Sequence, residues 1–198
     1  MVVFIIGGAR SGKSSLAEKI AAGQENKYGR QIIYLATAKA KDKEMGNRIE
    51  KHQKQRPDNW WTIEAELYPY QAIKSAEIPD KSVVILDCLT LLLTNHMINE
   101  EEFKLQKIKE ELKDFIKALN EKNCLIIFVA NETGLGIVPA SKLGRQFRDE
   151  AGRLNQWVAA QSDKTFFTVA GIPMELDKKK LTEDILNPES FYSGGKSR

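Results

Sequence analysis

Cysteine and histidine are scarce in this sequence, and long hydrophobic runs are missing. Its 198 residues include two cysteines, Cys88 and Cys124, and two histidines, His52 and His96. Both cysteines adjoin apolar runs, where a free thiol behaves as a small hydrophobic side chain, so no disulfide framework is expected. No run of about 18 apolar residues occurs, and the short apolar run near the N-terminus has no basic leader before it, so we predict neither a membrane span nor a signal peptide.

Neither sign of charge dominates. The chain has 30 basic and 27 acidic side chains, a formal net charge of +3, and both signs are scattered along it. This distribution lacks the basic surface that is typical of nucleic-acid-binding proteins. We therefore expect a cytoplasmic globular protein without a nucleic-acid partner.

The length and the 42% hydrophobic content fit one well-packed domain. No internal repeat and no Gly/Ser linker marks a domain boundary. From residue 177 the sequence becomes polar and contains Pro188 and a double glycine. We predict a single domain over residues 1–176 and a C-terminal extension over 177–198 that is at best partly ordered.

Five continuous apolar runs predict strands that are covered on both faces. The runs are 2–6, 31–37, 82–88, 124–131 and 164–172. Helical patterns fill the gaps, and the clearest covers 100–122. Its apolar residues at helical spacing are Leu105, Ile108, Leu112, Phe115, Ile116 and Leu119. Strands that alternate with helices predict an α/β fold with a mainly parallel central sheet flanked by helices.

The stretch GGARSGKS satisfies the pattern G-x-x-x-x-G-K-[ST] at every fixed position. It directly follows the first predicted strand and precedes a helical stretch, which is the context of a phosphate-binding loop. There the curled backbone and the helix N-terminus direct N–H groups at phosphate. A glycine-rich turn that merely starts a helix would not explain the full match. The predicted nucleotide-binding residues are Gly7, Gly8, Ala9, Arg10, Ser11, Gly12, Lys13 and Ser14.

Phosphate chemistry assigns further roles. Lys13 is expected to act catalytically by neutralising the β and γ oxygens, and the Ser14 hydroxyl to ligate Mg²⁺. Asp87 ends a buried strand, where ligands of parallel sheets bind, so it is the second expected metal ligand. An aspartate that only caps the following segment is the competing interpretation. The residues alone predict a Mg²⁺-dependent enzyme that binds a nucleoside triphosphate, but they identify no substrate.

Seven local sequences occur in one order along the chain. They are GGARSGKSSLAE (7–18), YLATA (34–38), RIEKHQKQRPDNWWTIE (48–64), DCLTLLLTN (87–95), VANETGLGIVP (129–139), GRQFRDEAGRLNQWVA (144–159) and VAGIPMEL (169–176). Together they resemble the bifunctional adenosylcobinamide kinase/adenosylcobinamide-phosphate guanylyltransferase family of cobalamin biosynthesis, from Met1 to about Leu176. The resemblance implies a P-loop NTPase fold of the RecA-like type.

The resemblance also implies a two-step reaction. ATP or GTP phosphorylates the aminopropanol hydroxyl of adenosylcobinamide, and GTP then donates GMP to that phosphate with release of pyrophosphate. His52 stands where the family motif R-I-x-x-H-x-x-x-R-P has the histidine that takes up the guanylyl group. A neutral imidazole is nucleophilic near pH 7, and a covalent intermediate splits one difficult displacement into two. Without the resemblance, His52 would be interpreted as a solvated residue of a charged helix face.

Further residues line the nucleotide site by resemblance: Ala36, Thr37, Ala38, Gln53, Lys54, Gln55, Arg56, Glu64 and Asp87. Glu64 also has a rationale of its own, because one carboxylate can accept from both N1–H and the exocyclic amine of guanine. An ordinary exposed glutamate is an equal alternative. The family often has glutamate where this chain has Asp87, which leaves metal binding intact but shortens the reach to base or ribose.

Other polar positions allow two interpretations. Asn131 and Glu132 either orient the cobinamide substrate or belong to a turn that needs the neighbouring glycines. Arg145 and Arg148 are candidates for phosphate neutralisation, with salt bridges to neighbouring acids as the alternative. His96 has no motif around it and is expected to be structural.

Two alternative functions keep the phosphate loop. One is a monofunctional small-molecule kinase that uses Lys13, Ser14 and Asp87 but not His52. The other is a nucleotide-binding regulatory switch. The sequence argues against it, because it has no partner-binding repeat and no long insertion. The resemblance further implies a closed homo-oligomer, with a trimer as the expected form.

Overall fold

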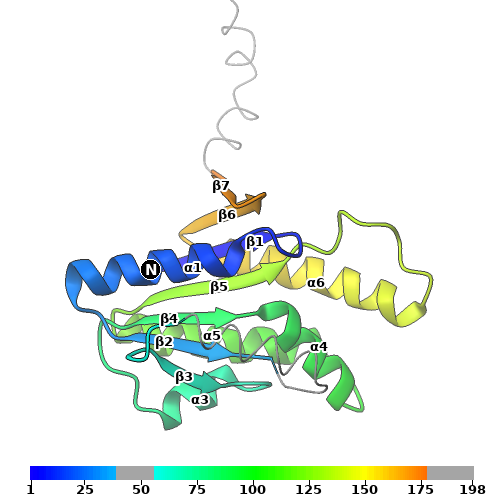
Figure 1. Cartoon of the computed structure of the whole chain (residues 1–198). Helices are drawn as coiled ribbons and strands as arrows, with labels where there is room; N and C mark the ends of the chain where they lie inside the picture. Colours follow the sequence, from blue (N-terminus) through cyan, green and yellow to red (C-terminus); the bar gives the residue numbers. More distant parts are fainter. Residues whose placement is uncertain (39–55, 178–198) are drawn as a thin grey trace, which may run out of the picture.

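The computed structural model describes residues 1–38 and 56–177. Within these residues, seven strands form one sheet in the order β3-β2-β4-β5-β1-β6-β7 (Figure 1). The strands are β1 (Val2–Gly7), β2 (Ile32–Ala36), β3 (Trp61–Glu64), β4 (Val83–Asp87), β5 (Leu125–Asn131), β6 (Lys164–Val169) and β7 (Ile172–Glu175). Neighbouring strands pair in parallel except β7, which is antiparallel to β6. The predicted α/β architecture with a mainly parallel sheet is confirmed.

Helices cover both faces of the sheet. They are α1 (Lys13–Tyr28), α3 (Pro69–Ser75), α4 (Leu89–Asn99), α5 (Leu105–Glu121) and α6 (Lys142–Gln161). Because successive strand residues point to opposite faces, Val3 and Ile5 of β1 pack in one cluster with α1. Phe4 and Ile6 pack in the other cluster, with α3, α4, α5 and α6. The runs 2–6, 31–37, 82–88 and 124–131 therefore correspond to strands buried on both faces, whereas β6 is only partly buried and β7 is exposed.

Helix α5 shows how its predicted apolar pattern is used. Ile108, Leu112, Phe115 and Leu119 are buried in the core. Leu105 and Ile116 are partly buried and pack against it, so all six predicted apolar positions contact the core. The helix begins at Leu105 rather than at residue 100, and Phe103 packs against the core before the first helical turn.

Two strands differ from the prediction. The run 164–172, expected as one strand, is divided by a turn in which Ala170 has φ 51° and Gly171 has φ 80°. Two consecutive residues with positive φ are the signature of a tight hairpin turn, so the chain reverses into β7. Strand β3 was not predicted, because it lies at the sheet edge and exposes Trp61 and Glu64, so its sequence carries no buried apolar run.

Several smaller expectations are also decided. Cys88 and Cys124 are free and buried, and His96 is buried with its ring nitrogens bonded to Glu100 and to the Leu67 carbonyl. In residues 1–38 and 56–177, no helix has both the length and the apolarity needed to span a bilayer. The predicted C-terminal extension lies outside the described residues from 178 onward.

The packing of α5 on β5 should contribute to the free energy of unfolding. Phe115 is fully buried and its ring lies 5.8 Å from that of Phe128. Because truncating a buried phenylalanine removes apolar contacts and leaves a cavity, Phe115→Ala should lower the free energy of unfolding by about 3–5 kcal/mol. Urea unfolding measures the loss. The exposed Lys113→Ala on the same helix serves as control, and equal midpoints for the two variants would contradict the packing described here.

Candidate active site

The phosphate loop connects the carboxyl end of β1 to the first turn of α1. Gly12 precedes the helix with φ 95°, a left-handed conformation that favours glycine, and Lys13 is the first helical residue. The strands on either side of β1 are β5 and β6. Residues 7–14, predicted as a nucleotide-binding loop, therefore form the strand–loop–helix unit that the motif requires.

The two fixed glycines of the loop are required by close packing. A Cβ on Gly7 would lie 2.4 Å from the Thr168 carbonyl oxygen, and a Cβ on Gly12 would lie 3.0 Å from the Gly171 Cα. The Gly171 N–H also donates to the Ser11 carbonyl at 2.9 Å. The turn between β6 and β7 thus packs directly on the phosphate loop, and side chains at either glycine would separate the two.

Lys13 is held inside this loop. Its side chain is largely buried, with the residue 7% exposed, and its ammonium donates to the Gly8 carbonyl and lies 3.4 Å from the Ser11 hydroxyl. A Cβ on Gly8 would meet nothing within 4 Å, so that side of the loop is open. A buried cation beside an open stretch of backbone suits the binding of phosphate oxygens.

The carboxyl ends of the neighbouring strands β2, β3 and β4 lie side by side. Ala36 of β2 pairs with Glu64 of β3 on one side and with Asp87 of β4 on the other. The peptide bond after Asp87 is cis, and the Thr37 hydroxyl accepts from the Cys88 N–H at 2.7 Å and donates to the Cys88 carbonyl at 2.8 Å. The predicted residues Ala36, Thr37, Glu64 and Asp87 are brought together at one sheet edge, and Ala38 follows directly.

A buried cluster of polar side chains joins this edge to α1. The Tyr34 hydroxyl donates to Asp87 Oδ2 at 2.6 Å. The Arg56 guanidinium carbon lies 3.3 Å from the centroid of the Tyr34 ring, and Arg56 Nε lies 3.8 Å from Glu18 Oε1. Four side chains from α1, β2, β4 and the segment before β3 therefore form one group.

Burial controls the electrostatics of this cluster. Desolvation raises the pKa of Glu18, the positive charge of Arg56 opposes that rise, and the negative charge of Asp87 adds to it. Burial and the neighbouring Asp87 also raise the pKa of Tyr34 above its ordinary value. Tyr34 consequently stays protonated and remains a hydrogen-bond donor to Asp87.

Arg56 is the unusual member of the cluster. Its side chain is 7% exposed, yet Nε and Nη1 are buried and have no hydrogen-bond acceptor in the described part of the chain. Buried guanidinium nitrogens normally have acceptors, and leaving them without any is costly. The phosphate oxygens of a nucleotide would supply such acceptors in the planar geometry that arginine prefers.

The donor set fits Mg²⁺ bound together with a nucleotide. Among the described residues, no group of three or more His, Cys, Asp and Glu side chains could hold a metal. Mg²⁺ in nucleotide sites needs only one or two protein ligands, since phosphates and water complete its octahedron. The Ser14 hydroxyl in the first turn of α1 and the Asp87 carboxylate, both predicted from the sequence, are donors of this kind.

His52, Gln53, Lys54 and Gln55 lie outside the described residues. Arg56, the next residue of the same predicted motif, lies inside them and belongs to the cluster. Tyr34 and Glu18 were not singled out from the sequence. The Tyr34 hydroxyl is the one polar side-chain group in the apolar stretch IIYLA and was an available signal, whereas Glu18 lies next to Lys19 and has no such signal.

Two predicted arginines have local partners. Arg145 donates to the carbonyls of Pro139 and Ala140, and Arg148 lies 3.4 Å from Asp149. The local contacts favour the alternative of salt bridging for Arg148. Glu132 accepts from the Gly134 N–H, so in this structure it shapes the loop that follows β5.

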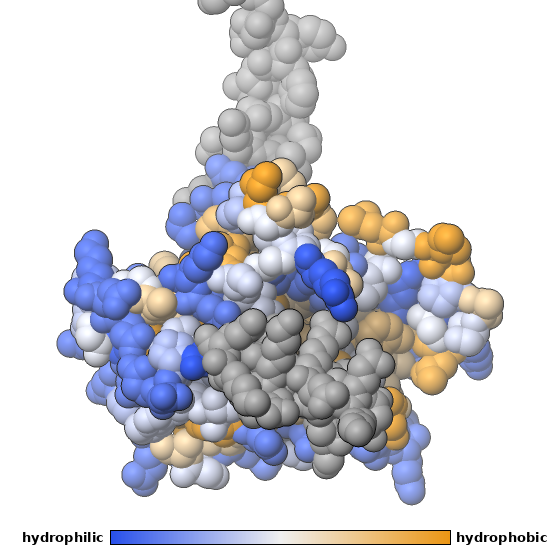
Figure 2. Space-filling model, in the orientation of Figure 1, coloured by the Kyte–Doolittle hydropathy of each residue, from blue (hydrophilic) through white to orange (hydrophobic). Residues whose placement is uncertain are grey.

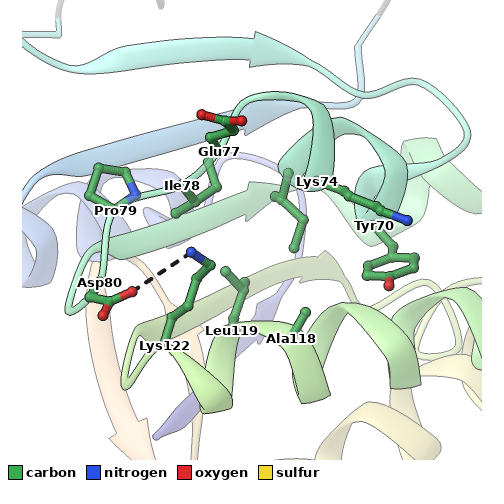
Figure 3. Close-up of a pocket in the computed structure, with 10 residues that line it drawn as sticks. Tyr70, Lys74, Glu77, Ile78, Pro79, Asp80, Ala118, Leu119 and Lys122 are labelled. Carbon is green, nitrogen blue, oxygen red and sulfur yellow. Dashed lines mark ion pairs between the residues drawn. The ribbon is translucent and has the colours of Figure 1, made fainter.

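A hollow lies at the opposite end of the strands from the phosphate loop. It measures about 540 Å³ between α3 and α5, and Figure 3 shows Asp80 and Lys122, 3.7 Å apart, at its rim. Both residues precede strands, β4 and β5 respectively, whereas the phosphate loop follows β1. In a parallel sheet these positions lie at opposite ends, so this hollow is not part of the candidate nucleotide site.

Apolar side chains are exposed in the loop after β5 and at the start of α6. The residues are Leu135, Ile137, Val138 and Leu143, and Ile137 is 96% exposed. They form one of the hydrophobic regions in Figure 2. A cluster of exposed apolar side chains of this kind indicates a surface that another molecule covers.

Comparisons with known proteins identify the family of this chain. The chain matches the family described as cobinamide kinase / cobinamide phosphate guanyltransferase over residues 3–176. It is 44% identical over 177 residues to the bifunctional adenosylcobalamin biosynthesis protein CobP of Pseudomonas aeruginosa, covering 89% of this chain and 98% of that one. It is 36% identical over 186 residues to the bifunctional adenosylcobalamin biosynthesis protein CobU of Escherichia coli, covering 89% and 99%.

Among solved structures, an ATPase domain resembles this fold with a TM-score of 0.51 at 16% identity, covering 84% of this chain and 68% of that one. This likeness agrees with the predicted P-loop NTPase fold. The sequence relatives carry the assignment further. The chain belongs to the cobinamide kinase / cobinamide phosphate guanyltransferase family.

Proposed function

We propose that this enzyme phosphorylates adenosylcobinamide and then transfers GMP from GTP to the product through a guanylyl group on His52. Kinase and guanyltransferase activities are those of its family. The observation that supports the histidine assignment is the place of Arg56, four residues after His52. It lies in one cluster with Asp87 and Tyr34, and its buried Nε and Nη1 have no acceptor among the described residues. Arg56 therefore lies near the carboxyl end of the sheet, the end at which the phosphate loop also begins.

In the kinase step, the aminopropanol oxygen attacks the γ-phosphorus of ATP or GTP. The bond from that phosphorus to the β–γ bridging oxygen breaks, the hydroxyl proton is released, and the nucleoside diphosphate leaves. The loop N–H groups and Lys13 stabilise the charge that gathers on the leaving phosphates. The buried ammonium of Lys13 supports this role.

In the transferase step, a ring nitrogen of His52 attacks the α-phosphorus of GTP, and pyrophosphate leaves. A phosphate oxygen of adenosylcobinamide phosphate then attacks the phosphoramidate, which forms adenosylcobinamide-GDP and frees the imidazole. Arg56 offers its in-plane donors to the phosphates during both displacements. Mg²⁺, when bound through Ser14 and Asp87, offsets phosphate charge.

The remaining predicted residues are assigned to the nucleotide. Glu64, exposed at the end of β3, is the proposed acceptor for the guanine N1–H and amine. Ala36, Thr37 and Ala38 are proposed to line the space beside it. Gln53, Lys54 and Gln55 are proposed to contact the phosphates together with Arg56. Because ATP and GTP are cytoplasmic metabolites, the cytoplasm is the proposed compartment.

We also propose a homotrimer. The exposed apolar side chains after β5 support a protein partner there, since isolated chains rarely leave such a group uncovered. A closed symmetric assembly would bury the same surface on every subunit.

The histidine assignment predicts a covalent label. Incubation with Mg²⁺ and GTP labelled at the α-phosphate should give acid-labile, base-stable labelling of the protein, because phosphoramidates hydrolyse in acid. His52→Ala should abolish the label while adenosylcobinamide phosphorylation continues, and the control His96→Gln should keep it. Phosphorylation without any label in the wild-type enzyme would favour the monofunctional kinase instead.

The loop lysine predicts a loss of phosphoryl transfer. Lys13→Ala should lower the rate of adenosylcobinamide phosphorylation by about 100-fold or more, because one charge-stabilising donor is removed from the transition state. Lys19→Ala, an exposed lysine on the same helix, is the matched control. Single-turnover phosphorylation at saturating nucleotide measures the effect, and similar rates for the two variants would refute the role of Lys13.

The oligomer predicts a native mass of three chains in sedimentation equilibrium. Ile137→Asp should shift this mass toward one chain, since a charge in an apolar interface is strongly unfavourable. Ile98→Asp, an exposed isoleucine on α4, is the control that should stay assembled. A wild-type mass of one chain would rule the trimer out.

A further inference from the structure

We propose that Tyr34 is a positioning residue of the nucleotide site, orienting Asp87 through its hydroxyl and holding the Arg56 guanidinium against its ring face. The inference rests on the proposed function and concerns the same site. It assigns a role to a residue of β2 that lies in the interior of the protein, 3% exposed.

The hydroxyl contact limits how Asp87 can turn. A carboxylate at the end of a strand can rotate about its side-chain bonds, and Asp87 is only partly buried. The short bond from the Tyr34 hydroxyl engages Oδ2 at 2.6 Å. With Oδ2 engaged, the direction of Asp87 Oδ1 relative to β4 is fixed. Hydrogen-bonded neighbours orient metal ligands in this way.

The ring contact holds Arg56 without using its donors. The guanidinium carbon lies 3.3 Å from the ring centroid, so the cation is supported through its flat face. The N–H bonds of a guanidinium lie in its plane and point outward. A stacked arginine therefore keeps its donating edge for a ligand. This agrees with Nε and Nη1, which have no acceptor among residues 1–38 and 56–177.

Glu18 also attracts Arg56 without accepting a hydrogen bond from it. Its Oε1 lies 3.8 Å from Arg56 Nε, which is close enough for charge attraction but too far for a hydrogen bond. Glu18 lies one turn after Ser14 on α1. Tyr34 therefore contacts Arg56 and Asp87 directly, and it is connected to the helix after the phosphate loop through Arg56 and Glu18. The buried Tyr34 side chain cannot move far, so it sets the spacing between Arg56 and the Asp87 carboxylate.

A purely structural tyrosine would behave differently. A buried hydroxyl needs a partner, and Asp87 would satisfy it whatever its other oxygen does. Under that interpretation, Tyr34→Phe would lower stability and leave nucleotide and metal binding unchanged. The Mg²⁺ requirement of GDP binding and the rate of labelling by α-labelled GTP distinguish the two interpretations, because a purely structural role would leave both unchanged.

The first experiment titrates GDP and Mg²⁺ by calorimetry, with no phosphoryl or guanylyl transfer involved. Tyr34→Phe keeps the ring and removes the hydroxyl. It should raise the Mg²⁺ concentration needed for half-maximal enhancement of GDP binding about tenfold, as expected when a partner of a metal ligand is lost. The difference from wild type should vanish when Mg²⁺ is chelated. An unchanged Mg²⁺ requirement would overturn the role of the hydroxyl.

The second experiment measures labelling by α-labelled GTP at saturating Mg²⁺. Tyr34→Leu removes the ring face and should slow labelling about tenfold, more than Tyr34→Phe does, because a desolvated cation–π contact of this size is lost. In an Arg56→Ala background, Tyr34→Leu should slow labelling no more than Tyr34→Phe does, because only the hydroxyl contact is left to lose. Phe128→Leu, a buried aromatic on the other face of the sheet, controls for stability. Multiplicative effects of Tyr34→Leu and Arg56→Ala would refute the ring contact.

The two experiments separate this inference from the proposed function. If the wild-type enzyme takes no α label, the His52 mechanism fails, and the GDP titration still decides the role of Tyr34. If labelling is normal and the variants resemble Phe128→Leu, the Tyr34 inference fails alone. Should Tyr34→Leu not fold, the titration of Tyr34→Phe decides.

Discussion

The phosphate loop keeps its shape because the other end of the described chain packs against its two fixed glycines. There is no room for a side chain at Gly7 below the Thr168 carbonyl or at Gly12 against Gly171. The hydrogen bond from Gly171 to Ser11 fixes the loop at a third point. The β6–β7 hairpin carries no phosphate-binding motif, yet it packs against the loop of the candidate nucleotide site. The glycines thus serve tertiary packing as well as the approach of phosphate.

The cluster around Tyr34 differs from the structural ion pairs of the protein. Lys164 and Glu175 join β6 to β7 at 2.9 Å on the surface, where water screens both charges. Arg56 instead has a buried side chain and incomplete hydrogen bonds. Taking a charge out of water is costly unless its donors are satisfied. An arginine kept in this state is typical of a site whose acceptors arrive with a ligand, which connects the packing of β2 to the chemistry at its end.

Local signals in the sequence were sufficient for most of the fold. Four of the five apolar runs predicted the buried strands, and the motif from Gly7 to Ser14 predicted the loop, because neighbouring residues carry all the information for both. Strand β3 escaped prediction because an exposed edge strand needs no apolar run, and the turn at Ala170 did so because alanine rarely adopts positive φ. The contacts of Tyr34 with Asp87 and Arg56 join segments far apart in sequence, so no local pattern reveals them.

The proposed mechanism requires one phosphate loop to serve attack at two different phosphorus atoms. In the kinase step the departing group is a nucleoside diphosphate, and in the transferase step it is pyrophosphate. The β-phosphate belongs to the leaving group in both, so negative charge develops on its bridging oxygens in both transition states. A cradle of N–H groups with Lys13 that stabilises the β-phosphate is therefore effective for either reaction. The nucleophile alone has to change, from the cobinamide hydroxyl at one end of the triphosphate to His52 at the other.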